Sequence, residues 1–434
     1  MITIQEHQRI NPAKLQSLNS EKLKRRINYD TSSFVASKIN LIRYEFDPNP
    51  EYEGFRSYFR IGAEWLDQDH TESLIVLPKI QNIDFIEMFM TCLQSSHPDD
   101  KFSEIYDIDL DAKPIHSKVL SSILSPLLVV QFLIVIKQIT ERGLRKGYVC
   151  RQENLKKVKG KIDFRKNQML NIWEAHRERV YCRFDEFSVD TPENRYLKRA
   201  LMVSSNMISL MEEHKSYSTI YAICNHCLSA FRDVSDTYDD IPNFTRNNKL
   251  YREYFDALRF ARMIISKEDM AIKSHNHNSF DLVPVFRIDM ALLFEHYVLA
   301  KLRNQFGRDG VIYQAKGSNA FKSDFLINKG SLKAIVDSKY TEIYEDGKVN
   351  SEYVKQLCGY ARDVGLLSKL GINFNDEDKV PIVPCTLIYP TLQKHKTNGI
   401  NLFEFSNSKT IKYFTTSVEI PLISDKISEQ RSFG

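Results

Sequence analysis

The sequence lacks several features that would assign it to a familiar functional class. It contains no phosphate-binding loop of the G-x-x-x-x-G-K-[ST] type, so we do not expect it to hydrolyse nucleotides by itself. Its most apolar run, Leu127–Ile136, is far shorter than the roughly 20 residues that span a bilayer, and it predicts a buried helix. The first residues lack the basic and then apolar pattern of a signal peptide. These absences predict a cytoplasmic protein without a membrane segment.

Cysteine and excess charge are also scarce. The chain has 7 cysteines, and Cys224 and Cys227 form its one C-x-x-C pair. No second pair of Cys or His follows at zinc-ribbon spacing, so we favour a buried reduced pair over a metal or redox site. The net charge is only +4, which permits contact with nucleic acid without requiring it. No base-reading module is recognisable, so sequence recognition is expected to lie on another protein.

Apolar bulk, in contrast, is plentiful. Hydrophobic residues make up 42% of the 434 residues, with 26 Phe and 21 Tyr, which is enough for more than one core. We predict a multidomain α+β protein. Its predicted regions are a β-rich domain over 1–112, a mainly helical region over 113–278, and an α/β domain over 279–434, where helices and strands alternate.

The most informative stretch is predicted to be a β-hairpin in the third region. Its strands cover Phe321–Ile327 and Leu332–Tyr340. The residues between them have the composition of a tight turn, in which Gly330 can adopt a positive φ at little cost. An exposed hairpin with a solvated ion pair is one interpretation of this stretch.

Three charged side chains interrupt these apolar strands and favour a catalytic interpretation. Asp337 and Lys339 are two residues apart and therefore point to the same face of the sheet. The hairpin brings Asp324 close to them. Two carboxylates and an ammonium are costly to desolvate together unless a cation or a substrate joins them. This pattern is typical of a Mg²⁺-dependent nuclease of the D…(D/E)-x-K type.

The helices predicted on either side of the hairpin add three candidate residues. Glu295 lies within an apolar stripe of a helix predicted over Val285–Gln305, where a carboxylate needs a partner. That stripe consists of Ile288, Leu292, Leu299 and Leu302. In the following helix, Gln356 and Tyr360 are four residues apart and share one face. Glu295 is thus a candidate metal ligand, and Gln356 and Tyr360 are candidates for contacting a substrate phosphate.

Phosphodiester hydrolysis explains why these residue types would gather. Hard carboxylate oxygens, here those of Asp324, Asp337 and Glu295, are the ligands that Mg²⁺ prefers, and the carbonyl of Ser338 is a further candidate. The metal lowers the pKa of a bound water and stabilises charge on the phosphate. Lys339 would position or deprotonate that water.

Several segments also occur in the order found in one family. They are LIVLPKIQNIDFIEMF at Leu74–Phe89, VKGKID at Val158–Asp163, FSVDTPENRYLK at Phe187–Lys198, LFEHYV at Leu293–Val298, the motif from Asp324 to Tyr340, Gln356–Tyr360, and LIYP at Leu387–Pro390. Through this ordered set, the chain resembles the McrC family, the nuclease subunits of McrBC modification-dependent restriction systems.

The resemblance implies a restriction-endonuclease-like PD-(D/E)xK fold for residues 279–434 and DNA as the substrate. It also implies that residues 1–112 dock onto a McrB-like AAA+ GTPase ring and stimulate its nucleotide hydrolysis. Ser323 precedes Asp324 where the motif's name has a proline, which is a departure from the pattern. Two other functions remain open: a non-catalytic DNA-binding adaptor that activates an NTPase, and a stand-alone repair nuclease.

Overall fold

The computed structural model describes most of the chain in segments. These are residues 1–10, 41–45, 54–67, 69–95, 100, 104–109, 112–209, 216–237, 252–273, 282–318, 322–341, 349–372, 383–392, 399–403, 405–407 and 413–423. The chain forms two compact units. Unit 1 consists of Met1–Ser121 and Asp281–Gly434, and unit 2 consists of Ser122–Phe280. The first and third predicted regions therefore share one unit, and unit 2 lies between them in the sequence.

The N-terminal part of unit 1 is built on a five-stranded sheet with the order β1-β5-β4-β12-β6. Its strands are β1 (Ile2–Gln5), β4 (Arg60–Trp65), β5 (Ser73–Leu77), β6 (Tyr106–Asp109) and β12 (Val285–Asp289). The β1–β5 pair is parallel, whereas the other neighbours are antiparallel. Helices α2 (Phe85–Ser95) and α8 (Met290–Phe306) pack against each other. A separate two-stranded sheet pairs β2 (Ile42–Glu45) with β3 (Gly54–Ser57).

Strand β12 corrects the prediction that one helix covers Val285–Gln305. Its residues alternate in burial, with Phe286 and Ile288 buried, because the strand pairs with β4 on one side and β6 on the other. The helix begins only at Met290, after Asp289 caps it by accepting a hydrogen bond from the Leu292 N–H at 3.1 Å. Ile288 therefore does not belong to the helical stripe, and a strand from the third predicted region completes the sheet of the first.

The C-terminal part of unit 1 contains a six-stranded mixed sheet with the order β13-β14-β15-β16-β18-β17. Its strands are β13 (Val311–Lys316), β14 (Lys322–Lys329), β15 (Leu332–Ser338), β16 (Cys385–Thr391), β17 (Phe405–Asn407) and β18 (Tyr413–Glu419). Strands β13, β14 and β15 pair antiparallel, while β15, β16 and β18 run parallel. Helices α9 (Ser351–Tyr360) and α10 (Val364–Lys369) pack on this sheet around a core that includes Leu326 and Ile335.

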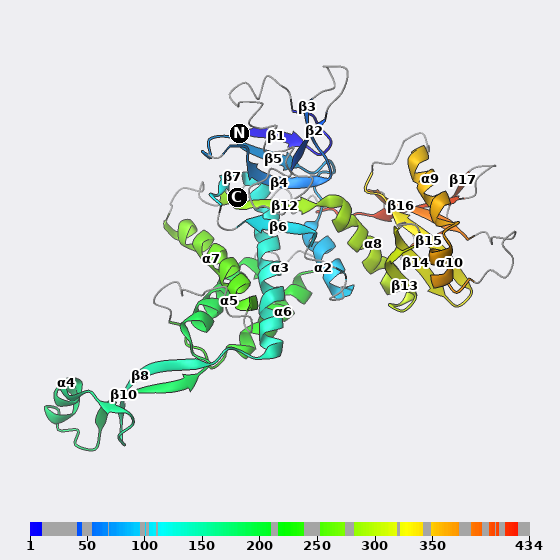
Figure 1. Cartoon of the computed structure of the whole chain (residues 1–434). Helices are drawn as coiled ribbons and strands as arrows, with labels where there is room; N and C mark the ends of the chain where they lie inside the picture. Colours follow the sequence, from blue (N-terminus) through cyan, green and yellow to red (C-terminus); the bar gives the residue numbers. More distant parts are fainter. Residues whose placement is uncertain are drawn as a thin grey trace. The chain divides into compact units, whose positions relative to one another are not determined.

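Unit 2 contains a helical core and a long β-hairpin (Figure 1). Helices α5 (Pro192–Ser209), α6 (Tyr217–Ala230) and α7 (Arg252–Lys273) pack together. The apolar run Leu127–Ile136 lies in α3 (Lys118–Arg142) and is largely buried, as predicted. Cys224 and Cys227 are buried free cysteines on α6, which agrees with the favoured interpretation. Within the part of the chain that the structure describes, no helix has the length and apolar character needed to cross a membrane.

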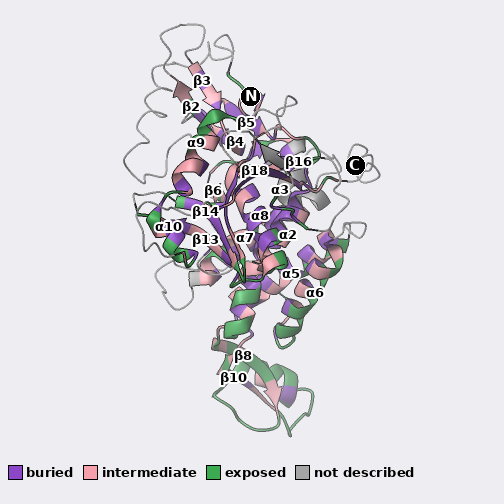
Figure 2. Ribbon diagram, turned by 90° about the vertical axis from the view of Figure 1, so that its right-hand side faces the viewer, coloured by how far each residue is buried: buried purple, intermediate pink, exposed green. Residues whose placement is uncertain are grey.

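The hairpin departs from the prediction of a mainly helical middle region. Strands β8 (Gly147–Leu155) and β10 (Val180–Ser188) pair antiparallel along nine residues. Between them lie β9 (Lys161–Ile162), α4 (Phe164–Asn167) and a π-helical turn, η5 (Gln168–Ile172). Much of this segment is exposed (Figure 2). We define residues 147–188 as the unit 2 hairpin.

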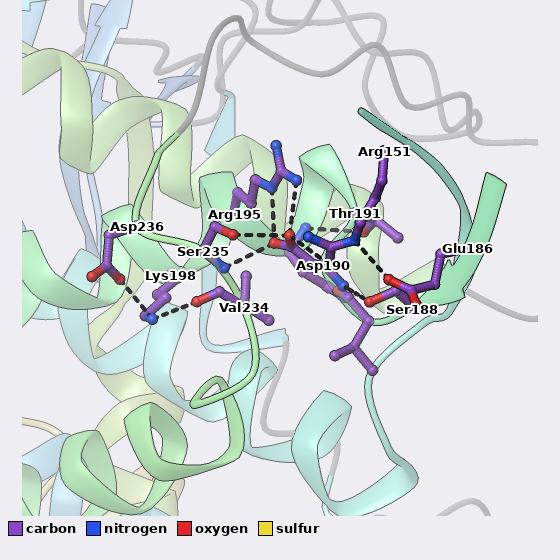
Figure 3. A network of polar contacts seen from close by, with 12 residues as sticks. Arg151, Glu186, Ser188, Asp190, Thr191, Arg195, Lys198, Val234, Ser235 and Asp236 are labelled. Atoms are coloured by element: carbon purple, nitrogen blue, oxygen red, sulfur yellow. Dashed lines mark hydrogen bonds and ion pairs between the residues drawn. The ribbon is translucent and has the colours of Figure 1, made fainter. Parts of the chain in front are cut away.

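A buried carboxylate joins the unit 2 hairpin to the helices (Figure 3). Asp190, just after β10, accepts hydrogen bonds from the Arg195 guanidinium on α5, two of them at 2.8 Å. It also accepts hydrogen bonds from the N–H and the hydroxyl of Ser235, both at 2.8 Å, and lies 3.4 Å from the Arg151 guanidinium. Burial alone would raise the pKa of Asp190, but the hydrogen bonds from Arg195 and Ser235 outweigh burial and lower it to about 2.

Candidate active site

The predicted hairpin at the candidate site is present as β14 and β15. The two strands pair from Phe325↔Val336 to Lys329↔Leu332, around a turn in which Gly330 has φ 61°. Phe321, the predicted first residue, lies outside the described residues. Two strands and a glycine turn are therefore present as predicted, but β14 continues to Lys329 and β15 ends at Ser338, two residues before the predicted end.

Asp337 is the most deeply buried charged group of the site. Its side chain is 0% exposed, and its Oδ2 lies 2.6 Å from the Lys339 Nζ. Its Oδ1 accepts no hydrogen bond from any described residue. Burial and the nearby charge of Asp324 raise the pKa of Asp337, and Lys339 only partly opposes them. The fold thus keeps a carboxylate in an environment that disfavours its ionised form.

Asp324 is held by the strand next to it. Its Oδ2 accepts hydrogen bonds from the Ser338 N–H at 2.8 Å and from the Ser338 hydroxyl at 2.9 Å. The Ser338 side chain therefore orients Asp324, while its role as a carbonyl ligand stays a prediction. Burial disfavours the charged ammonium of Lys339, but the charges of Asp337 and Asp324 outweigh burial and raise its pKa. Lys339 is thus a protonated cation at neutral pH, which suits positioning better than proton abstraction.

Glu295 approaches the same group from helix α8. Its Oε1 accepts a hydrogen bond from the Gln314 amide at 3.0 Å. Burial and the charge of Asp324 raise the pKa of Glu295, and Glu295 in turn contributes to the raised pKa of Asp337. The structure therefore brings the three predicted carboxylates within electrostatic reach of one another.

Gln356 and Tyr360 lie on one face of α9, as their spacing predicts, but they bind each other. The Gln356 amide donates to the Tyr360 hydroxyl at 2.5 Å, and that hydroxyl donates to the Lys322 carbonyl at 2.7 Å. Tyr360 is buried and fastens α9 to the start of β14. In this arrangement the pair supports the strand that carries Asp324, and its contact with substrate stays a prediction.

Sequence reasoning missed Gln314 and Tyr313 on β13. The Gln314 amide also donates to the Tyr313 hydroxyl at 3.0 Å, and that hydroxyl lies 3.2 Å from the His296 Nε2. Burial lowers the pKa of His296 to about 4, so its ring is neutral at pH 7. No motif marks either residue in the sequence, because both look like ordinary strand residues.

The donor set fits a hydrated Mg²⁺ better than a fully enclosed transition metal. Among the described residues, no group of three or more His, Cys, Asp or Glu side chains could hold a metal ion alone. Mg²⁺ keeps several waters and commonly uses one or two carboxylates, whereas structural zinc needs four protein ligands. The Asp337 Oδ1, buried without a hydrogen-bond donor, is a ready ligand.

The chain has recognisable relatives at the family level. The model of a family described as McrBC 5-methylcytosine restriction system component matches residues 66–365. No curated protein matches the chain. One similar structure is titled as a refined half-complex from a tetradecameric assembly of Thermococcus gammatolerans McrB AAA+ hexamers with bound McrC. The two chains are 16% identical, the match covers 99% of this chain and 98% of that chain, and the TM-score is 0.38. The cryo-EM structure of the Thermococcus gammatolerans McrBC complex is similar at 15% identity, covering 69% and 86%, with a TM-score of 0.28.

Proposed function

The chain belongs to the McrBC 5-methylcytosine restriction system component family, and from this premise we propose that it is the metal-dependent endonuclease subunit of a McrBC-like restriction system. It cleaves DNA when it is assembled with a McrB-like AAA+ GTPase, whose activity it stimulates. The observation that carries this proposal is the buried Asp337 carboxylate, which is paired with Lys339 and close to two further carboxylates. Such an arrangement is costly for folding and useful for catalysis.

The proposed nuclease domain is of the PD-(D/E)xK type, and residues of β14, β15 and α8 have separate roles in the reaction. Asp324 and Asp337 would hold Mg²⁺, with Glu295 and the Ser338 carbonyl in support. When bound, Mg²⁺ supplies a water of lowered pKa and neutralises phosphate charge. Lys339 remains protonated, positions the attacking water and stabilises negative charge that develops on the phosphate.

Two substitutions test the catalytic assignment. Asp337→Ala and Lys339→Ala are each expected to reduce DNA cleavage by about 100-fold or more, because each removes charge that acts at the reacting phosphate. The assay combines the chain with a McrB-like AAA+ GTPase, GTP, Mg²⁺, and methylated or unmethylated DNA. Lys355→Ala is a matched control, because this lysine is exposed on α9 and pairs only with Glu352 among the described residues.

The same assay separates this proposal from the alternatives. Unchanged cleavage by Asp337→Ala or Lys339→Ala overturns the catalytic assignment and leaves the adaptor. Full cleavage by the isolated chain, without a GTPase or GTP, indicates a stand-alone nuclease.

Exposed apolar side chains on the unit 2 hairpin support the proposed partner. Single exposed apolar residues are common on soluble proteins, whereas several gathered on one exposed segment are typical of an interaction surface. On this hairpin, eight of them are exposed: Tyr148, Val158, Phe164, Met169, Leu170, Ile172, Trp173 and Phe187. We therefore assign the GTPase contact to this hairpin in addition to the docking predicted for residues 1–112.

Co-purification with the GTPase tests this surface. Phe164→Ala together with Trp173→Ala is expected to weaken co-purification by about tenfold or more, since buried aromatic anchors dominate interfaces. Val364→Ala, at an exposed apolar residue of unit 1, is the matched control. Unchanged co-purification of the double variant would remove the hairpin from the interface.

A further inference from the structure

Gln314 has a backbone conformation that a strand residue rarely adopts. Its φ is 49°, in the left-handed region, although it lies within β13. The other described non-glycine residues with positive φ, which are His7, His70, Asn82 and Ala175, lie in turns or bends. A non-glycine residue held in this way is strained, and it persists only where its surroundings stabilise it.

The strained residue lies opposite a proposed metal ligand. Tyr313 pairs with Phe325 and Ala315 pairs with Ser323, so Gln314 faces Asp324 at the position where the ladder is interrupted. The register is the same on both sides of this position, so no residue has been inserted. The distortion is therefore local to Gln314 and not a general bend of the strand.

The distortion changes which groups the Gln314 side chain can reach. In a regular strand, Tyr313 and Gln314 would point to opposite faces. The positive φ breaks this alternation, and one amide nitrogen donates to both the Tyr313 hydroxyl and the Glu295 Oε1, each at 3.0 Å. A primary amide has two N–H groups, one for each acceptor.

The neighbours of Gln314 lock this arrangement. The Tyr313 ring stacks on Phe325 and packs edge-on against His296, so its hydroxyl is held in place beside the Gln314 amide. His296 follows Glu295 on α8, so the cluster ties β13 to the helix that carries the carboxylate. Gln314 donates to Glu295 through its side-chain amide, and the Tyr313 hydroxyl also interacts with that carboxylate.

We propose that Gln314 is a positioning residue for the divalent metal, whose strained backbone holds its amide against Glu295 and aims that carboxylate at Asp324 and Asp337. This inference rests on the proposed function. A glutamine suits the task, because it donates hydrogen bonds without adding charge to a group of three carboxylates.

Two substitutions separate the effect of losing the Gln314 amide from the effect of relieving its backbone strain. Gln314→Gly removes the amide and relieves the left-handed backbone, whereas Gln314→Met removes the amide, keeps the side-chain length and leaves the strain. Outer partners of metal ligands typically contribute 10- to 100-fold to metal affinity. Both variants are therefore expected to bind Mn²⁺ about tenfold more weakly, while the unfolding midpoint rises for Gln314→Gly and does not rise for Gln314→Met.

The measurements are isothermal titration with Mn²⁺ alone and thermal unfolding of the full chain. The role of Gln314 is overturned if both variants bind Mn²⁺ as tightly as the wild type. The proposed function stays intact in that case, provided that the wild type binds Mn²⁺ and Asp337→Ala does not. Absence of Mn²⁺ binding by the wild type overturns the metal-dependent function and this inference with it. Gln314→Asn tolerates positive φ but has a side chain one methylene shorter, so its Mn²⁺ affinity is expected to fall between those of the wild type and Gln314→Gly.

Discussion

Two aspartates, one in each unit, are buried almost equally and have opposite electrostatic environments. Asp190 in unit 2 receives hydrogen bonds from Arg195 and Ser235, and its pKa is lowered to about 2. Asp337 in unit 1 has one cation beside it and two other carboxylates within reach, and its pKa is raised. A buried carboxylate that is fully satisfied stabilises a junction, whereas one left short of partners marks a candidate functional site.

The largest effect is expected from removing the satisfied carboxylate. Asp190→Ala leaves the Arg195 guanidinium half-buried without its carboxylate, and it should destabilise unit 2 by about 3–5 kcal/mol. Urea unfolding, with hydrogen-exchange mass spectrometry to resolve the units, measures this loss. Asp185→Ala on β10 is the control, because Asp185 is exposed. A loss below about 1 kcal/mol would show that the network in Figure 3 is not a structural junction.

Substitution of Asp337 should affect cleavage and leave stability largely unchanged. Asp337→Asn keeps the shape but removes a charge from a site that disfavours it, so stability is expected to stay the same or rise by about 1 kcal/mol. Cleavage should nevertheless fall by about 100-fold or more. Thermal unfolding and the cleavage assay are measured on the same preparation. A marked loss of stability would mean that Asp337 serves the fold in the way that Asp190 does.

The contributions of the two aspartates to folding stability should change in opposite directions with pH. An unfolded Asp has a pKa of about 3.9, so the stability from Asp190 is present above pH 4 and is lost as the pH falls towards 2, by about 2–3 kcal/mol. For Asp337, whose pKa is raised to about 7, the folded state binds more protons between pH 4 and 7, and stability therefore falls as the pH rises through that window.

Urea unfolding between pH 2.5 and 8 tests both of these pH dependences of stability. Asp190→Asn should flatten the acid limb of the profile, and Asp337→Asn should flatten the decline from pH 4 to 7. Identical profiles for the wild type and either variant would contradict the corresponding shift.

The smallest predicted effect compares two serines with the same task. Ser235 and Ser338 each donate a backbone N–H and a hydroxyl to an aspartate. Ser235→Ala should cost about 1 kcal/mol of stability and leave cleavage unchanged. Ser338→Ala should loosen Asp324 and reduce Mn²⁺ affinity several-fold. Equal effects of both substitutions on Mn²⁺ affinity would contradict the division between the units.

The sequence predicted the parts of the site whose signals are local. The β14–β15 hairpin followed from strand alternation and a glycine turn, and Glu295 followed from a carboxylate on an apolar helical face. Strand β12 was missed because its five residues run directly into α8, so the change of period is too short to see. Its pairing with β4 and β6 is a long-range contact, which no local pattern reports.

Gln314 was missed for a different physical reason. Its left-handed φ departs from the regular pairing on either side of it, and no local sequence pattern reports such a departure. The unit 2 hairpin escaped prediction because the long helices before and after it, α3 and α5, dominate the pattern of the middle region. Its own strands do alternate: on β10, Cys182 and Phe184 are buried, whereas Arg183 and Asp185 are exposed. Most of its large apolar residues are exposed and therefore do not mark a core.

The ladder between β7 (Ile115–His116) and β11 (Leu282–Val283) has an evolutionary consequence. It pairs the strand just before residues 122–280 with the strand just after them, so the chain leaves and re-enters unit 1 at two neighbouring strands. Residues 122–280 are thus an insertion between paired strands, and the strand pairings of unit 1 do not include them. Changes confined to the insertion would therefore leave the strands that carry Asp324 and Asp337 intact.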